Sequence, residues 1–356
     1  MSGVPQGGLD PRDPALFLHD IDFGAGRAGF VRADRAGLSA EPFLDHRWRP
    51  AEAIDAALPL SALSALSALP VGAGEAPHID FIWHTSFCAS TLLSACLDAP
   101  GVSLALKEPR VLVLLAAMKR SGRFDANLAK AVFGLLGRRF EANERILVKP
   151  SNGANTLIAE AAALTQGRML LLYSDCESFV LSMAGQGRAG FAYVRDRFRS
   201  LAADGHPAGA WPPAELFRLT DLELAALVWR MQMDALETAS ARLGDRARSL
   251  DCKLLLEQPD QVLPRVDAFF GLGLGRERLE AVVAGPLFRR DAKHPGQAFD
   301  ARARSQERDR LRAQLGDDLP GVLQSIEQAF PRLPRLAKPL MAEPVSRTLD
   351  VSAPAA

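Results

Sequence analysis

From Ile79 onward, short apolar runs alternate with segments of helical pattern, and this alternation limits the possible folds more than any other feature of the chain. Strands separated by helices pair in parallel, and the helices then cover the faces of the sheet. Strands are expected at 79–83, 102–106, 146–148, 169–173 and 250–256, and helices at 90–97, 109–118, 127–140, 155–164, 176–184, 220–244 and 261–270. The sequence therefore predicts an α/β fold with a doubly wound, mostly parallel sheet.

Three parts are expected along the chain. Residues 1–76 are expected to form a helical N-terminal extension and linker, because Leu60 to Leu69 repeats Leu-Ser-Ala at a spacing close to one helical face and is followed by Pro70, Gly72 and Gly74. The α/β domain is expected at 77–340, with a polar, basic and mobile lid near 285–304. Residues 341–356 are expected to be a disordered tail.

Charge and cysteine content exclude several classes of function. Forty-two basic and forty-two acidic residues cancel, so the chain has no overall field that would attract nucleic acid or an anionic membrane. The four cysteines lack the paired spacing of a zinc site and are typical of reduced, cytoplasmic thiols. Neither a secretory signal nor an apolar run of the roughly 20 residues that span a membrane is visible. Any anion site must therefore be local.

The segment from Ile79 to Leu93 predicts such a site. A buried-type strand passes through a turn of small residues into a helix that opens with Ser90 and Thr91. The N–H groups and the dipole of a helix N-terminus attract an anion, and two hydroxyls add donors. No lysine or arginine lies between Asp80 and Lys107, so the positive charge that usually accompanies a phosphate loop is missing from this segment.

Five motifs in order give a family resemblance. Ala89-Ser90-Thr91-Leu92-Leu93 resembles the phosphosulfate loop of sulfotransferases, and Leu97-Asp98-Ala99-Pro100-Gly101-Val102 is similar to the segment that follows it in the bacterial and tyrosylprotein branches. Lys107-Glu108-Pro109-Arg110-Val111, Lys149-Pro150 and the stretch from Leu254 to Leu272 resemble three later motifs. The resemblance spans about residues 79 to 300 and implies a P-loop nucleotide-binding sulfotransferase.

The resemblance implies a role for each matching residue. The donor would be 3′-phosphoadenosine-5′-phosphosulfate (PAPS), with no metal, and the acceptor a hydroxyl on a small molecule, glycan or peptide. Glu108 would be the catalytic base and Lys149 would stabilise the transferred group. Nucleotide contacts would come from Ser86, Phe87, Cys88, Ala89, Ser90, Thr91, Leu92, Ser182 on the 3′-phosphate, and Lys293 in the closing segment.

Three positions depart from the family pattern. Phe87 occupies the place of a basic residue, Ala89 that of a glycine, and Ser174 that of the arginine that pairs with the 3′-phosphate. A charge-assisted hydrogen bond to phosphate contributes about 1.5–3 kcal/mol, so the cation must come from elsewhere if the donor binds tightly. The candidates are Lys107, Arg188, Arg289, Arg290 and Lys293.

Alternative interpretations stay open at this point. A non-catalytic relative that has lost donor binding would explain Phe87 and Ser174, and a kinase-like phosphotransferase is a weaker possibility because the Gly-Lys-Ser/Thr ending is absent. Glu108 is equally compatible with a simple helix start, and His84 with a strand-end histidine whose hydrogen bonds are satisfied.

Overall fold

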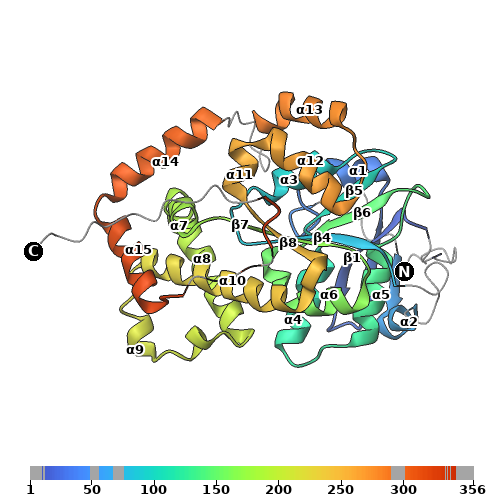
Figure 1. The fold of residues 1–356 in the computed structure, drawn as a ribbon. Coiled ribbons are helices and arrows are strands. Elements are labelled where there is room, and N and C mark those ends of the chain that lie inside the picture. The colour runs from blue at the N-terminus through green and yellow to red at the C-terminus, as the bar shows by residue number, and fades with distance from the viewer. Residues whose placement is uncertain are drawn as a thin grey trace, which may run out of the picture.

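The computed structural model describes residues 10, 13–48, 56–66, 76–289, 301–332, 334, 336 and 338–341. Its centre is a five-stranded parallel sheet in the order β5-β6-β4-β7-β8 (Figure 1). The strands are β4 (Ile79–His84), β5 (Ser103–Lys107), β6 (Arg145–Lys149), β7 (Met169–Tyr173) and β8 (Ala247–Asp251). Strand order reverses at β4, the first strand of this sheet in the chain. The prediction of a doubly wound parallel α/β fold is confirmed.

Apolar side chains of β4 point alternately to the two faces of the sheet. Phe81 and Trp83 join one buried cluster, whereas Ile82 joins the other. The first face is covered by α4 (Arg110–Arg120), α5 (Ala126–Leu136) and α6 (Ile158–Leu164). The second is covered by α3 (Ser90–Leu97), α11 (Cys252–Glu257), α12 (Pro259–Phe270) and α13 (Arg276–Ala284). Burial on both faces explains why these strands read as continuous apolar runs.

A helical layer extends the domain beside β7. It contains α7 (Cys176–Gly185), α8 (Gly187–Ala203), α9 (Pro213–Leu216), α10 (Asp221–Leu243), α14 (Ala301–Leu315) and α15 (Asp318–Ala329). The predicted capping box of α10 is present, because Thr220 Oγ1 accepts the Glu223 N–H at 3.2 Å and the Glu223 carboxylate accepts from Thr220 N. The sequence patterns had not indicated α8, α13, α14 or α15.

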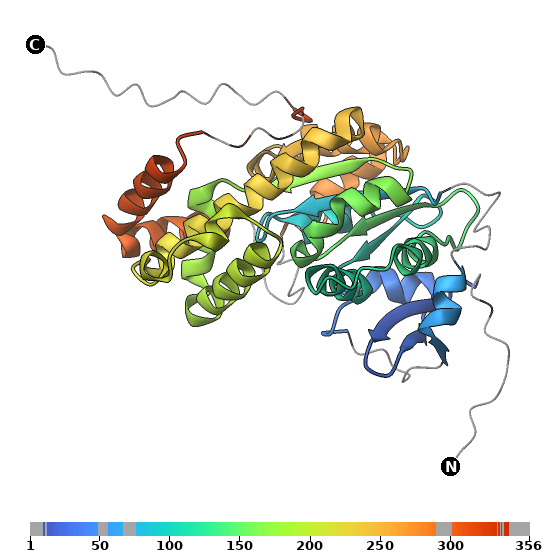
Figure 2. The ribbon, with the colours of Figure 1, turned by 90° about the horizontal axis from the view of Figure 1, so that it is seen from below.

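The N-terminal region differs from the prediction. Instead of a helical extension it is mainly an antiparallel sheet of β1 (Leu16–Asp22), β2 (Arg27–Arg32) and β3 (Ala56–Pro59), with two short helices, α1 (Arg35–Ala40) and α2 (Leu60–Ala65). A hairpin forms because the Asp22 carboxylate accepts the N–H groups of Gly24 and Ala25, and the turn ends at Gly26 with φ 65°. The apolar β1 and β2 then pack beside α4 and α5 in one shared core (Figure 2).

One predicted strand is displaced along the sequence. Residues 250–256 were assigned to a strand, but β8 is Ala247–Asp251, and the Asp251 carboxylate accepts the Lys253 N–H and caps α11, which occupies the rest of the predicted range. The predicted boundaries of the three parts stay a prediction. Of the disordered tail expected at 341–356, residues 342–356 lie outside the described residues, as do residues 290–300 of the lid expected near 285–304. Among the described helices, none combines the length and apolar character needed to cross a bilayer.

Candidate functional site

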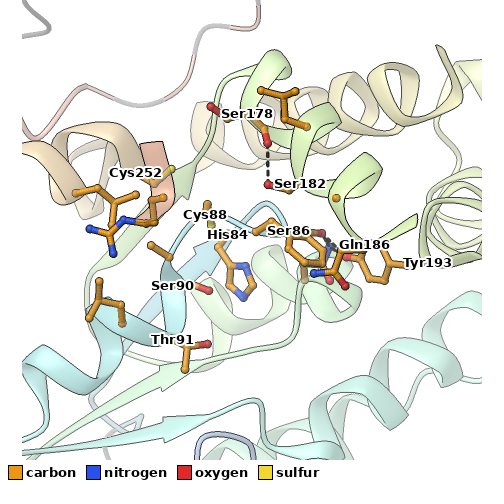
Figure 3. A pocket seen from close by; sticks show the side chains of 18 of the residues that line it. His84, Ser86, Cys88, Ser90, Thr91, Ser178, Ser182, Gln186, Tyr193 and Cys252 are labelled. Carbon is orange, nitrogen blue, oxygen red and sulfur yellow. Dashed lines mark hydrogen bonds between the residues drawn. The ribbon is translucent and has the colours of Figure 1, made fainter. Parts of the chain in front are cut away.

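A cavity of about 710 Å³ opens at the carboxyl ends of the central strands (Figure 3). Its walls come from the turn between β4 and α3, from Glu108 after β5, from α7, from α11, and from the part of α14 between Arg304 and Leu311. In open parallel sheets, ligands bind at this edge, where the strand order reverses. The cavity therefore lies where the fold favours a nucleotide-sized ligand, and it contains the predicted phosphate loop.

Backbone strain is concentrated at this cavity. Among the described residues, the non-glycine residues with a left-handed φ are Phe87 (57°), Ala89 (59°) and Glu108 (55°), and all three line the cavity. Such conformations cost of order 1–3 kcal/mol each and persist where the surroundings impose them. Ala89 adopts a left-handed conformation that glycine adopts more easily. This agrees with the glycine that the family pattern has at this position.

Substitution of Ala89 tests that strain. Ala89→Gly removes the cost of about 1–2 kcal/mol that alanine has in a left-handed conformation. It also increases the conformational entropy of the unfolded chain, which costs about 0.5–1 kcal/mol of stability, so the free energy of unfolding is expected to stay equal or rise slightly. Ala95→Gly, in the interior of α3, is the matched control and should destabilise by about 0.5–1 kcal/mol. Urea unfolding distinguishes the two. Equal losses for both variants would mean that Ala89 carries no strain.

The hydroxyls of Ser90 and Thr91 lie at the start of α3 beside His84 (Figure 3). Both residues are nearly buried, and both line the cavity. Cys88 Sγ lies 2.9 Å from the Thr85 carbonyl oxygen, so its thiol takes part in the packing of the turn. The α3 N-terminus has no side-chain cap, which leaves its N–H groups directed at the cavity.

Ser86 has different partners. Its hydroxyl contacts the Tyr193 hydroxyl and accepts a hydrogen bond from Asn152 Nδ2 at 2.6 Å. Asn152 also donates to Gln232 Oε1 at 2.9 Å, and the Ser86 N–H donates to the same oxygen at 3.2 Å. Phe87 packs edge-on against Tyr193, with ring centroids 5.7 Å apart. These neutral groups form the end of the cavity that lies away from α11.

His84 contacts two backbone carbonyl oxygens, that of Thr85 through Nδ1 at 2.6 Å and that of Pro150 through Nε2 at 2.9 Å. A neutral imidazole has a single N–H and can donate to only one of these oxygens, so the fold supplies a partner for that donor, as the strand-end interpretation of the sequence held. Burial, and after it the nearby Lys149 ammonium, lowers the pKa of His84 to about 4, outweighing the carbonyl contacts that favour the charged form. His84 is therefore neutral at physiological pH.

Glu108 and Lys149 lie in direct contact. Lys149 ends β6 and Glu108 follows the paired strand β5, where its N–H donates to the Lys149 carbonyl oxygen at 2.7 Å. Lys149 Nζ binds Glu108 Oε1 and lies 3.4 Å from Thr91 Oγ1. The lysine is 1% exposed and, unlike Glu108, is not among the residues that line the cavity. Glu108, Lys149 and Thr91 of the phosphate loop thus meet at one point, although Thr91 and Lys149 lie 58 positions apart in sequence.

Arg47 is a cavity residue that the sequence patterns did not indicate. The segment around Arg47 lies in space next to the carboxyl end of β5, because Leu44 N donates to the carbonyl oxygen of Lys107, the last residue of that strand, at 2.7 Å. Arg47 Nη2 donates to Glu108 Oε2 at 3.0 Å and to Asp45 Oδ2 at 2.6 Å, and its guanidinium covers the Phe43 ring at 3.4 Å. Both oxygens of Glu108 therefore contact cations.

These cations control the ionisation of Glu108. Burial by itself would raise the pKa of this carboxyl, but the Lys149 ammonium, and after it Arg47, outweighs burial and lowers the pKa below its ordinary value. A carboxylate that acts as a base is ionised above its pKa. As the pH falls through that pKa the carboxylate becomes protonated, and the activity that depends on it is lost. The acid limb of kcat/KM is therefore expected to lie below the ordinary glutamate range.

Arg47→Met tests this electrostatic effect. Methionine keeps contact with Phe43 and removes the charge, so the acid limb should move to higher pH while the alkaline side stays unchanged. The measurement is the pH profile of kcat/KM for both proteins, with nucleotide affinity as a check on folding. Superimposable acid limbs would rule out a contribution of Arg47 to the ionisation of Glu108.

Ser182 lies on the opposite wall, on α7. Its hydroxyl donates to the Ser178 carbonyl oxygen at 2.8 Å (Figure 3). Arg308 of α14 reaches the same wall and donates to Ser178 Oγ at 3.0 Å, and Arg304 lines the cavity one turn earlier. Ser174 is fully buried and its hydroxyl has no hydrogen-bond partner. The arginines of α14 were missed because no sequence pattern connects 304 and 308 with α7.

Several predicted cations do not reach the cavity. Lys107 points away from it, with Nζ donating to the Ser39 carbonyl oxygen at 2.5 Å. Arg188 and Arg289 are not among the residues that line it, while Arg290 and Lys293 lie outside the described residues. Within the part of the chain that the structure describes, no cluster of three or more histidine, cysteine, aspartate or glutamate side chains is arranged for a metal.

No family model matches the chain, and no curated protein matches it. It is similar to the structure of a sulfotransferase domain from the curacin biosynthetic pathway, at 17% identity and a TM-score of 0.42, over 67% of this chain and 97% of that one. It is also similar to the crystal structure of a sulfotransferase from Alicyclobacillus acidocaldarius, at 13% identity and a TM-score of 0.36, over 72% of this chain and 97% of that one. Both solved structures are named as sulfotransferases, the family that the order of the motifs resembles.

Proposed function

We propose that the chain is a sulfotransferase that transfers the sulfuryl group of PAPS to an acceptor hydroxyl. The observation that carries this proposal is the contact of Glu108 with Lys149, beside Thr91 at the start of α3. A carboxylate, a buried ammonium group and a helix N-terminus at one point supply a base, a cation and an anion cradle. Sulfuryl transfer, like phosphoryl transfer, mainly requires positioning and neutralisation of oxygens.

The pocket fits this donor. Ser90, Thr91 and the uncapped N–H groups of α3 would hold the 5′-phosphosulfate end, together with the backbone of Phe87, Cys88, Ala89 and Leu92. Ser182 lies on the opposite wall for the 3′-phosphate. The Nε atom of Arg308, on that same wall, is buried without a hydrogen-bond partner, which is the state expected of a donor group that binds a ligand. Ser86, bound by Asn152, would serve by shaping the turn.

PAPS supplies a sulfuryl group carried on a phosphate leaving group. Glu108 would take the proton of the acceptor hydroxyl while the new S–O bond forms and the S–O bond to phosphate breaks. Once Glu108 is neutral, Lys149 loses its counter-charge, and its Nζ can then stabilise the negative charge that grows on the leaving phosphate. The pair would thus couple proton removal to charge stabilisation.

A transfer assay tests the proposal. The purified chain is incubated with PAPS and a panel of aryl and alkyl hydroxyl compounds, and the release of adenosine 3′,5′-bisphosphate and the sulfated product are both measured. The matched control uses ATP in place of PAPS. Bisphosphate release with a sulfated product supports the proposal. A phosphorylated product from ATP, with none from PAPS, would establish a phosphotransferase instead.

A further inference from the structure

The wall of the cavity formed by α7 and α14 carries a positive charge that no described contact neutralises. Neighbouring arginines on α14 are paired: Arg310 with Glu307, and Arg312 with Glu177 and Asp309. Arg308 lines the cavity and has no ion pair among the described residues. Its hydrogen bond is to a neutral group, Ser178 Oγ, at 3.0 Å. The guanidinium therefore contributes a positive charge that no described carboxylate contacts directly, the nearest link being through Ser178 Oγ to Asp175.

One donor of that guanidinium is also unsatisfied. Arg308 Nε is inaccessible to solvent and has no hydrogen-bond partner. A buried donor without an acceptor costs about 1–3 kcal/mol, and most buried polar groups in proteins avoid this cost. A planar guanidinium can bind two oxygens of a phosphate through Nε and an Nη, and the Arg308 side chain must turn for its Nε to reach a ligand in the cavity. The missing partner is thus best matched by an anion with several oxygens.

The position of Arg308 is fixed by packing. Arg304, Arg308 and Leu311 lie on one face of α14 at helical spacing, and Leu311 is buried against α7. Gly185 permits this approach, because a Cβ atom there would lie 3.1 Å from Leu311 Cδ1. The ion pair of Arg312 with Glu177 joins the same two helices. The helix pair therefore holds the Arg308 guanidinium beside Ser178 and Ser182.

From these contacts we infer that Arg308, positioned by Ser178, is the cation that binds the 3′-phosphate of the donor nucleotide together with Ser182; this inference rests on the proposed function. The charge comes from a residue 126 positions after Ser182 in the sequence, and Ser174 provides none. To donate to the phosphate, Ser182 Oγ must turn its hydrogen away from the Ser178 carbonyl oxygen. The Asp175 carboxylate is occupied in capping α7, where it accepts from Ser178 N and Oγ.

Titration calorimetry with two nucleotides isolates this subsite. Adenosine 3′,5′-bisphosphate and 5′-AMP differ by the 3′-phosphate alone, so the Kd of 5′-AMP divided by the Kd of the bisphosphate measures what that phosphate contributes. Arg308→Gln, which keeps polar contact with Ser178, is expected to lower the ratio about 10- to 100-fold by weakening the bisphosphate and sparing 5′-AMP. Arg308→Lys should lower it less, because a point charge remains.

A control variant and the affinity for 5′-AMP distinguish a loss of the 3′-phosphate contact from a failure of the protein to fold. Arg302→Ala removes an exposed charge from the same helix, off the cavity, and should leave the ratio unchanged. Retained 5′-AMP affinity shows that the Gln variant is folded. An unchanged ratio in Arg308→Gln would overturn the assignment of Arg308 while leaving the proposed function intact. An unmodified protein that binds 5′-AMP as tightly as the bisphosphate would overturn the 3′-phosphate site altogether, and with it the choice of donor.

Discussion

Glu108→Gln is expected to lower kcat about 10²- to 10⁴-fold, the range that a general base contributes, while leaving nucleotide affinity nearly unchanged. Glutamine retains the size of the side chain and a hydrogen bond to Lys149, but it cannot take up the proton of the substrate hydroxyl. It also frees Lys149 of its counter-charge, so the bisphosphate product should bind equally or more tightly. The measurements are single-turnover transfer and calorimetric binding.

The matched control is Glu160→Gln. Glu160 pairs with Lys119 and does not line the cavity, so its replacement should leave kcat unchanged. Full turnover in Glu108→Gln would show that the base is another group. Loss of both turnover and nucleotide binding would instead show that Glu108 holds the site together, since its backbone is left-handed and bonded to Lys149.

Lys149→Met is expected to lower kcat about 10²- to 10³-fold, the cost of removing one preorganised donor from a developing anion. Methionine keeps the apolar contact with Phe43, over whose ring the ammonium group lies at 5.6 Å. Removing one partner of a buried pair also destabilises by about 3–5 kcal/mol, so thermal unfolding must be measured alongside turnover. The pKa of Glu108 should rise, because its largest neighbouring cation is gone.

Lys107→Met provides the comparison that separates chemistry from stability. Lys107 and Lys149 are paired residues on adjacent strands, and both are nearly buried, but Lys107 points to Ser39 and away from the cavity. Its replacement is expected to cost stability and to leave kcat close to normal. If both variants lose turnover in proportion to their loss of stability, Lys149 has a structural role and no catalytic one.

Much of the parallel sheet could be predicted because four of its five strands, all except β8, are short, mainly apolar runs that are buried on both faces. Ile79 to Trp83 has no polar residue except Asp80, and the small-residue turn after it shows where the helix begins. The strand ends then bring Glu108 and Lys149 to one edge, as the topology of parallel sheets requires. Contacts that depend on strand order therefore followed from the sequence pattern.

Contacts between segments far apart in the chain could not be predicted in the same way. Arg47 reaches Glu108 because Leu44 hydrogen-bonds beyond the end of β5, and Arg308 reaches Ser178 because Leu311 packs beside Gly185. Neither arginine belongs to a local motif. The N-terminal sheet was missed for a related reason: the Leu-Ser-Ala repeat favoured helix, while the hairpin at Asp22 to Gly26 depends on side-chain contacts with the turn.

Calorimetric titration with adenosine 3′,5′-bisphosphate, ATP and 5′-AMP, at low and moderate salt, tests the central claim most directly. Binding of the bisphosphate that is at least about 10-fold tighter than that of 5′-AMP, and tighter than that of ATP, is the predicted result. Its affinity should also fall with added salt, because charge neutralisation carries the preference. Tighter binding of ATP, or no binding of any of the three nucleotides, would contradict the assignment of this cavity to PAPS.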